Sequence, residues 1–331
     1  MTESTGYNFI KLDQLYSQPL EIDWLIEDIM PSDSIGMIYG ASGCGKSHII
    51  LSMAAMVANG LSWFDKDTKQ GNVLIMAGEG LGGIARRLKA IEIENNLTID
   101  RARLHVSNRA IGLDTIEGHK LVEQAIEELE EKPQIIFIDT LSRHLDESQE
   151  NSNDDMARFI NKLDQIRLKY KCTIVLVHHT GKSENQGARG ASALKANVDF
   201  SFNISGENKT CSFTCDKMKD ADDAISAKCF AIKEIDLGEV SSKGKPITGA
   251  CVVKSNTVIS LKVSKQSNEE LALSCFNPAS KGWQKAYVAI CSEAITEESK
   301  ASQFRRAKKN LIATGRVTEH EDRSLTIAQA A

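Results

Sequence analysis

"YGASGCGKSHII", running from Tyr39 to Ile50, is the stretch that decides the fold. Gly40, four further residues and then Gly45-Lys46-Ser47 satisfy the phosphate-loop pattern in full. In this pattern the glycines let backbone N–H groups turn inward around phosphates, a lysine ammonium reaches the β and γ oxygens, and a serine hydroxyl ligates magnesium. An apolar run, IGMIY, leads into the loop, and a helical run closed by Gly60 follows it. This context disfavours an ordinary glycine-rich turn.

The loop predicts ATP and Mg2+ as cofactors. Ser47 is the first expected ligand of the metal ion. The expected nucleotide-binding residues are those of the loop and the first helical turn, namely Gly40, Ala41, Ser42, Gly43, Cys44, Gly45, Lys46, Ser47 and His48.

The composition is that of a globular protein. The chain has 331 residues, of which 41% are hydrophobic and 26% charged, with only 5 Pro. This length accommodates one large α/β core and a smaller domain. The first residues lack a basic segment followed by an apolar one, and no run approaches about 18 apolar residues, so we expect a cytoplasmic protein without a membrane partner. The formal net charge of −5 argues only weakly against DNA binding, because local basic loops suffice for it.

The remaining pattern predicts an α/β fold. Apolar runs such as GNVLIMA, QIIFIDT and CTIVLVHH alternate with helical stretches, which is typical of a parallel sheet covered on both faces. One of these stretches, LVEQAIEELEEKP, reads as a helix stopped by Pro133. Between residues 199 and 271 the pattern changes to short β-rich runs, which indicate an antiparallel extension of the same sheet.

A polar stretch near residues 264–270 suggests a domain boundary, and residues 281–331 read as two helices and a two-stranded wing. The sequence therefore predicts an N-terminal arm (1–24), an ATPase core (25–270) and a small winged-helix-like C-terminal domain (271–331).

Three strand ends carry residues suited to ATP hydrolysis. Asp139 ends the run QIIFID, where a carboxylate can serve the magnesium ion. No Glu follows Asp139, so the general base must come from elsewhere, and Glu79 between two glycines is the candidate. His178 and His179 end a third strand. Adjacent strand residues point to opposite faces, so joint metal binding is disfavoured and one imidazole is expected to face the nucleotide.

This ordered set of motifs resembles the RecA-like hexameric ATPase superfamily. The phosphate loop, the A-G-E-G turn, QIIFIDT and LVHHTGK followed by ARGASALKANVDF are most similar to plasmid RepA-type replicative helicases, over roughly residues 20–265. The resemblance implies a RecA-like P-loop NTPase core that assembles into a homohexameric ring and hydrolyses ATP between subunits. It also implies that Glu79 is the catalytic base, Asp139 binds magnesium and His179 senses the γ-phosphate.

A basic loop follows the histidine strand. GKSENQGARGASALKAN contains Lys182, Arg189 and Lys195 against one acid, which suits sequence-tolerant contact with a single-stranded backbone. The resemblance places Lys182 and Arg189 at the central channel of the ring.

Further along, CDKMKDAD offers two more basic residues, Lys217 and Lys219, at alternate positions of a strand end. By resemblance they would enter the neighbouring subunit's nucleotide site. A solvated strand edge is the alternative.

The C-terminal domain carries a second basic segment. From Lys300 to Arg316 there are six basic residues and no acid, on an expected helix that would present Arg305, Arg306 and Lys309 to DNA phosphates. Winged helices also dock proteins, so both uses remain open at this point.

The expected function is an ATP-dependent DNA helicase or translocase of the RepA type. Its expected partners are single-stranded DNA, further copies of itself and other replication proteins. One alternative is an ATP-gated DNA-binding regulator, or a replication or recombination accessory ATPase without unwinding activity. Another is a recombination or strand-annealing ATPase of the RecA type, which should form filaments rather than closed rings.

Overall fold

The computed structural model describes residues 9–17, 19–78, 80–150, 152–180, 194–207, 209–221, 228–255, 272–273, 275–276, 280–290, 297–313, 317–320 and 325–327. The chain divides into two compact units, Met1–Ile259 and Ser260–Ala331. The expected boundary at residue 270 falls within residues 256–271, outside the described residues, and stays a prediction.

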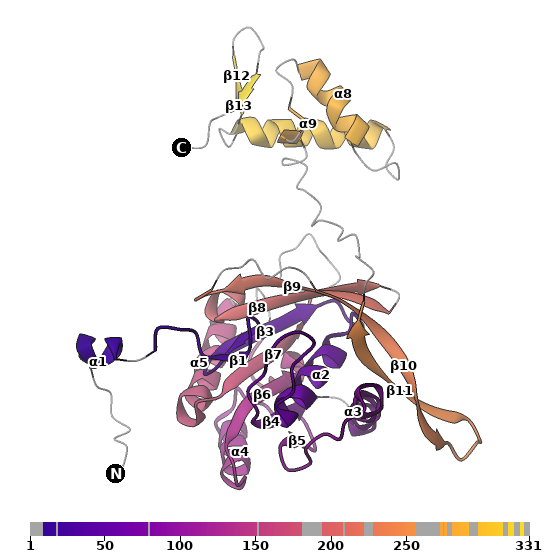
Figure 1. Cartoon of the computed structure of the whole chain (residues 1–331). Coiled ribbons are helices and arrows are strands. Elements are labelled where there is room, and N and C mark those ends of the chain that lie inside the picture. The colour runs from indigo at the N-terminus through magenta and orange to yellow at the C-terminus, as the bar shows by residue number, and fades with distance from the viewer. Residues whose placement is uncertain are drawn as a thin grey trace. The chain divides into compact units, whose positions relative to one another are not determined.

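The first unit is built on one nine-stranded sheet, in the order β11-β10-β9-β8-β3-β7-β6-β4-β5 (Figure 1). From β8 to β5 neighbouring strands are parallel, and from β8 to β11 they are antiparallel. This confirms a mostly parallel α/β sheet with an antiparallel extension. The strands are β3 (Ile35–Gly40), β4 (Asn72–Ala77), β5 (Leu104–Val106), β6 (Pro133–Asp139), β7 (Thr173–His179), β8 (Phe200–Glu207), β9 (Thr210–Met218), β10 (Lys228–Val240) and β11 (Pro246–Lys254).

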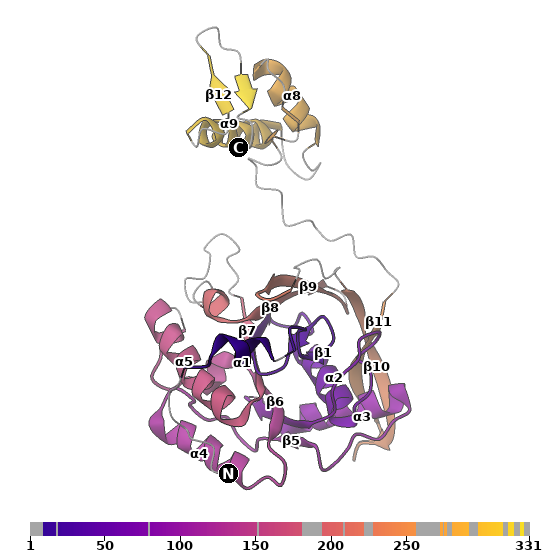
Figure 2. The same cartoon turned by 60° about the vertical axis from the view of Figure 1, so that its left-hand side comes forward.

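Helices cover both faces of the sheet, as Figures 1 and 2 show. One core contains the apolar residues of α2 and part of α3, and the other contains those of α4 and α5. Residues of α2 are apolar nearly all round, which is why this helix is enclosed, and Gly60 ends it in the left-handed conformation with φ 64°. The helices are α2 (Lys46–Asn59), α3 (Leu81–Asn95), α4 (Ile116–Glu127), the 3-10 turn η1 (Leu141–His144) and α5 (Asn153–Tyr170).

Three details differ from the sequence-based expectation. The helix α4 ends at Glu127, well before Pro133, and Pro133 instead begins β6, a strand position that tolerates its missing N–H. The apolar pattern also predicts a buried strand through QIIFIDTLSRH, but β6 ends at Asp139 and Leu141–His144 form the 3-10 turn η1. The edge strand β5 is only three residues long and half-buried, too short for a periodic signal. One of the β-rich runs that the sequence predicts between residues 199 and 271, TVISLKV (257–263), lies outside the described residues.

The N-terminal arm holds a short helix, α1 (Leu12–Tyr16), with no buried residue. A small hairpin of β1 (Trp24–Ile26) and β2 (Met30–Pro31) then leads into β3. None of the described helices is both long and apolar enough to cross a membrane.

The second unit contains α8 (Ser280–Ile290), α9 (Glu297–Ala313) and an antiparallel pair, β12 (Val317–Glu319) with β13 (Leu325–Ile327). Its own core gathers Trp283, Tyr287 and Phe304, with the Trp283 Nε1–H donating to the Ala272 carbonyl at 2.6 Å. The described elements are the two helices and the two-stranded wing that the sequence predicted.

Gly36 tests the packing behind the phosphate loop. It pairs with Phe200 across β3 and β8, and a Cβ at Gly36 would overlap the outer end of the Phe200 ring, 2.0 Å from its Cζ. We expect Gly36→Ala to lower the free energy of unfolding by about 1–3 kcal/mol, because this core cannot absorb the methyl group. Urea denaturation followed by circular dichroism measures the change.

The control is Gly82→Ala, since Gly82 is exposed near the start of α3 and nothing lies within 4 Å of the point that an alanine methyl group would occupy there. This change should be neutral or stabilise by up to about 1 kcal/mol. An unfolding midpoint for Gly36→Ala equal to that of the unsubstituted chain would contradict the packing described here.

Candidate active site

Four parallel strands deliver the candidate residues to one edge of the sheet. Gly40 at the end of β3 pairs with His179 at the end of β7, and Ala77 at the end of β4 pairs with Asp139 at the end of β6. Carboxyl ends of parallel strands meet at the same edge, which is where ligands bind in open α/β sheets. The structure therefore brings Gly40, Asp139 and His179 to one edge of the sheet.

The phosphate loop has a backbone that only glycine accommodates at two points. Gly43 and Gly45 have φ of 77° and 102°, in the left-handed region that side chains disfavour. At Gly40 the constraint is space, because a Cβ there would overlap the Ile204 carbonyl oxygen. The loop opens directly into α2, which starts at Lys46 without a side-chain cap. The first N–H groups of α2 thus remain available to an anion.

Lys46 is held inside the loop. Lys46 is 3% exposed, and its ammonium donates hydrogen bonds to the carbonyl oxygens of Gly40 at 2.8 Å and Ala41 at 2.7 Å. It also lies 2.9 Å from Nδ1 of His179, which accepts when the imidazole is neutral. Burial is the main cause of the lowered pKa of Lys46, and the nearby carboxylate of Asp139 opposes this effect. The ammonium is therefore poised where phosphate oxygens would replace the loop carbonyls.

The two histidines face opposite sides of β7, as their adjacency predicts. His179 reaches Lys46, whereas His178 is buried and its Nδ1 lies 2.9 Å from Oε1 of Glu150, in the segment before α5. Both cannot ligate one metal ion. His179 is the imidazole on the phosphate-loop side.

Ser47 and Asp139 fit a magnesium ion by their chemistry. Ser47 lies partly exposed in the first turn of α2, and Asp139 is near enough to Lys46 for its charge to affect the lysine pKa. A hydroxyl and a carboxylate are oxygen ligands of the kind that Mg2+ takes together with phosphates and water. The peptide bond from Asp139 to Thr140 is cis.

Glu79 lies outside the described residues. Its neighbour Gly78 donates its backbone N–H to the Asp139 carbonyl at 2.6 Å, and the stem of Arg143 packs where a Gly78 side chain would stand. The chain on one side of Glu79 is thus fixed at the Asp139 strand end, and the role of Glu79 as base stays a prediction.

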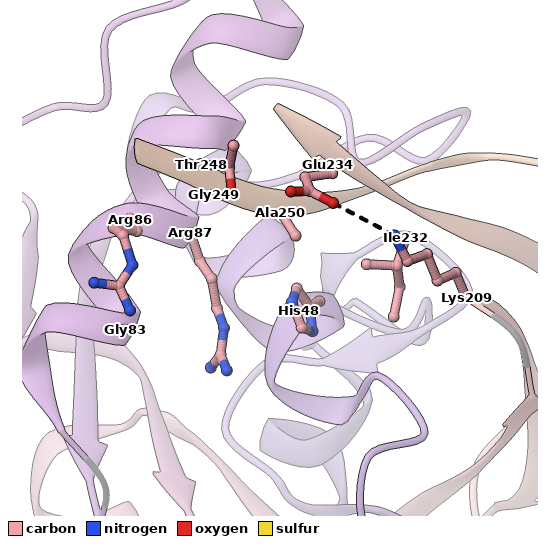
Figure 3. Close-up of a pocket in the computed structure, with 10 residues that line it drawn as sticks. All are labelled: His48, Gly83, Arg86, Arg87, Lys209, Ile232, Glu234, Thr248, Gly249 and Ala250. Carbon is pink, nitrogen blue, oxygen red and sulfur yellow. Dashed lines mark hydrogen bonds and ion pairs between the residues drawn. The ribbon is translucent and has the colours of Figure 1, made fainter. Parts of the chain in front are cut away.

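A cleft adjoins the loop between α2, α3 and the antiparallel strands (Figure 3). Its volume is about 280 Å3, and Ile232 of its wall lies 3.2 Å from the point that a Cβ at Gly45 would occupy. Burial, followed by the charge of Arg87, lowers the pKa of His48 to about 4, so this imidazole is neutral at pH 7. The lining residues are His48, Gly83, Arg86, Arg87, Lys209, Ile232, Glu234, Thr248, Gly249 and Ala250.

This cleft was not predicted from the sequence. Its walls on β10 and β11 are brought to α3 by strand pairing between distant segments, for which the sequence has no local signal. The only sequence signal of this wall among the cleft residues is Gly249, because a Cβ there would overlap the Arg86 carbonyl oxygen. The reason for this glycine becomes clear only when the pairing of β10 with β11 beside α3 is known.

Three predicted basic residues are engaged within their own chain. The Lys217 ammonium donates to the carbonyl oxygens of Lys195, Ala196 and Val198 at 2.9, 3.0 and 2.6 Å. Lys219 directly follows the end of β9, and its ammonium lies 3.6 Å from Asp199 Oδ1. Lys195 pairs with Asp216, so its charge is partly neutralised.

Lys182 and Arg189 fall in residues 181–193, outside the described residues. The described chain on both sides of this segment is tied to β3. Before it, the Thr180 N–H donates to the Gly40 carbonyl at 3.1 Å. After it, the Lys195 partner Asp216 accepts a hydrogen bond from the Tyr39 hydroxyl.

The last predicted set, Arg305, Arg306 and Lys309, is exposed on α9 of the second unit.

A family model described as an AAA domain matches residues 4–185. The matched part is more than half of the chain and contains the phosphate loop, Asp139 and the His178–His179 strand end. Together with the sheet order and the loop geometry, the match shows that this chain is a member of the AAA domain family of P-loop ATPases.

Proposed function

We propose that this chain is an ATP-driven DNA helicase of the RepA type. It would hydrolyse ATP at subunit interfaces of a homohexameric ring and move on single-stranded DNA. The observation that carries the proposal is the anchoring of the basic segment 181–193: Thr180 before it bonds Gly40 of the phosphate loop, and Lys195 after it pairs with Asp216, the partner of Tyr39. A change at the phosphates can therefore reach both ends of this segment through β3.

The phosphate end of ATP would occupy the loop. The first N–H groups of α2 would bind the phosphates, and Lys46 would exchange the carbonyls of Gly40 and Ala41 for β and γ oxygens. Magnesium, held through Ser47 and Asp139 when bound, would neutralise part of the phosphate charge. Glu79 would take a proton from the attacking water.

The cleft beside the loop suits the base and ribose. It begins at His48 in the first turn of α2 and is lined by the guanidinium-bearing side chains of Arg86 and Arg87. Planar guanidinium groups stack on aromatic rings such as the adenine base. Because His48 is neutral, it does not repel the positively charged arginines.

His179 would report whether a γ-phosphate is present. Its Nδ1 accepts from Lys46 at 2.9 Å in this structure. When the Lys46 ammonium binds the phosphates instead, its hydrogen bond to His179 would break. The His179 side chain and the end of β7 could then move. Thr180 and the basic segment follow directly in the chain, so this step would link hydrolysis to DNA contact.

Two observations support assembly with other copies of the chain. Six apolar side chains of the N-terminal arm are at least half exposed, and a neighbouring subunit would cover them. They are Phe9 (88%), Ile10 (59%), Leu12 (58%), Leu15 (50%), Tyr16 (67%) and Leu20 (87%). Lys219 is exposed and holds only a long contact to Asp199. It is better suited than Lys217 to reach a neighbour's phosphates, because Lys217 would give up three hydrogen bonds.

Glu79→Gln tests the catalytic assignment. The substitution keeps size and polarity but removes the base, so ATP turnover should fall by at least about 100-fold while ATP binding is retained. Equilibrium binding of a fluorescent ATP analogue and steady-state phosphate release measure the two effects separately. Undiminished turnover in this variant would refute the role of Glu79.

The basic segment is tested by Lys182→Ala combined with Arg189→Ala. The double variant should lose most of the DNA-stimulated part of ATP hydrolysis and the displacement of a strand from a forked duplex, while the basal rate without DNA stays the same. The dependence of single-strand binding on salt should become shallower, by about 0.7 per lost phosphate contact.

A matched control removes two exposed lysines elsewhere, in Lys120→Ala with Lys243→Ala. In this control variant, the basal and the DNA-stimulated rates of ATP hydrolysis should both be unchanged. If the basal rate of the Lys182 and Arg189 variant fell as much as the stimulated rate, the segment would have a structural role and not a DNA-contacting one.

A second candidate function is an ATP-gated DNA-binding regulator, which the exposed basic face of α9 favours. The two functions differ in which DNA acts on the ATPase. The motor requires stimulation by single strands, whereas the regulator requires duplex affinity that changes with bound nucleotide and little stimulation by single strands.

A further inference from the structure

The second unit has the opposite charge to the rest of the chain. Residues 260–331 contain eleven Lys and Arg against eight Asp and Glu, a net charge of +3, which leaves −8 on residues 1–259. The fields of such oppositely charged parts attract different partners. The positive unit is therefore the part of the chain whose net charge favours binding of a polyanion.

The basic residues of α9 lie opposite its buried stripe. Phe304, Ala307 and Leu311 recur at helical spacing and are at most 2% exposed. At 100° per residue, Arg305, Arg306 and Lys309 are centred on the opposite side of the helix, and all three are exposed. Because the apolar face of α9 packs into the core, the basic face must point toward solvent.

None of these three side chains forms an ion pair with a residue that the structure describes, and Arg305 makes only a 3.3 Å hydrogen bond to the Ala301 carbonyl of its own helix. Removing these charges therefore breaks no ion pair of the described fold.

We propose that this outer face of α9 is a binding site for duplex DNA, with Arg305, Arg306 and Lys309 contacting phosphates. An α-helix fits the major groove of B-DNA, which is about 12 Å wide, and basic side chains projecting from a packed helix reach the flanking backbones. This site is built from other residues than the segment 181–193, and the proposal does not depend on the proposed motor activity.

A protein partner is disfavoured by the surface itself. Among the residues described in the second unit, no large hydrophobic side chain is exposed, whereas protein interfaces centre on buried aromatic and aliphatic anchors. A single strand is disfavoured as well. Trp283, Tyr287 and Phe304 are enclosed in the core, so they offer no platform on which unpaired bases could stack.

The hairpin beside α9 limits the site to the helix. Val317 and Leu325 pack into the core, and the exposed Thr318 and Thr326 pair across the strands. The described strands β12 and β13 carry no Lys or Arg. Phosphate contact is thus assigned to α9 alone.

The test uses the full chain carrying Arg305→Gln, Arg306→Gln and Lys309→Gln together. Glutamine preserves helix propensity and polarity while removing the three charges. Affinity for a 20-base-pair duplex of mixed sequence should fall at least about tenfold, and the slope of log K against log salt should become shallower by about 2.7, or 0.9 per phosphate. ATP hydrolysis and its stimulation by oligothymidine should not change.

Two further variants make the result specific. Lys285→Gln removes an exposed charge from α8 and should have no effect on duplex affinity. Arg305→Lys with Arg306→Lys keeps the charges and should keep the affinity, which a loss of folding would not. Unchanged duplex affinity in the triple variant would overturn the proposal. So would an equal loss for oligothymidine, or an equal loss in Lys285→Gln.

Discussion

The rest of the structure depends on one buried positive charge. The ammonium of Lys46 is enclosed by the phosphate loop and held by the carbonyls of Gly40 and Ala41 and by His179. Burying a charge is costly unless partners surround it, and here the partners come from the ends of β3 and β7. This arrangement requires the loop glycines and the close approach of β8 at Gly40. It also requires that His179 lie on the loop side of β7. A phosphate group is the natural replacement for those partners.

The same arrangement couples the site to distant parts of the core. Tyr39 and Gly40 are consecutive residues, and the chain before and after residues 181–193 bonds to one or the other of them, directly or through Asp216. Lys217 adds three hydrogen bonds at the later anchor. A movement of β3 and β7 on nucleotide binding would therefore reach the basic segment 181–193 through only one or two contacts. The second unit adds a separate positive face on α9.

Much of this was predictable from sequence, and the exceptions have physical causes. The phosphate loop, the alternation of apolar strands with helices and the opposite sides of His178 and His179 all follow from local pattern. The cleft walls on β10 and β11 do not, because only long-range pairing brings Thr248 and Glu234 to α3. The end of α4 was misplaced because Pro133 can begin a strand as well as stop a helix. The in-chain bonds of Lys217 depend on a short helical turn at residues 194–197 that no motif indicated.

The central claim is that single-stranded DNA stimulates ATP hydrolysis at this loop. The most direct measurement is the ATPase rate of the purified chain with and without single-stranded DNA, with Lys46→Ala as the control for contaminating activity. The account predicts strong stimulation by single strands and loss of both rates in Lys46→Ala. A rate that requires Lys46 but is indifferent to single strands would contradict the motor and leave the ATP-gated regulator as the function of this chain.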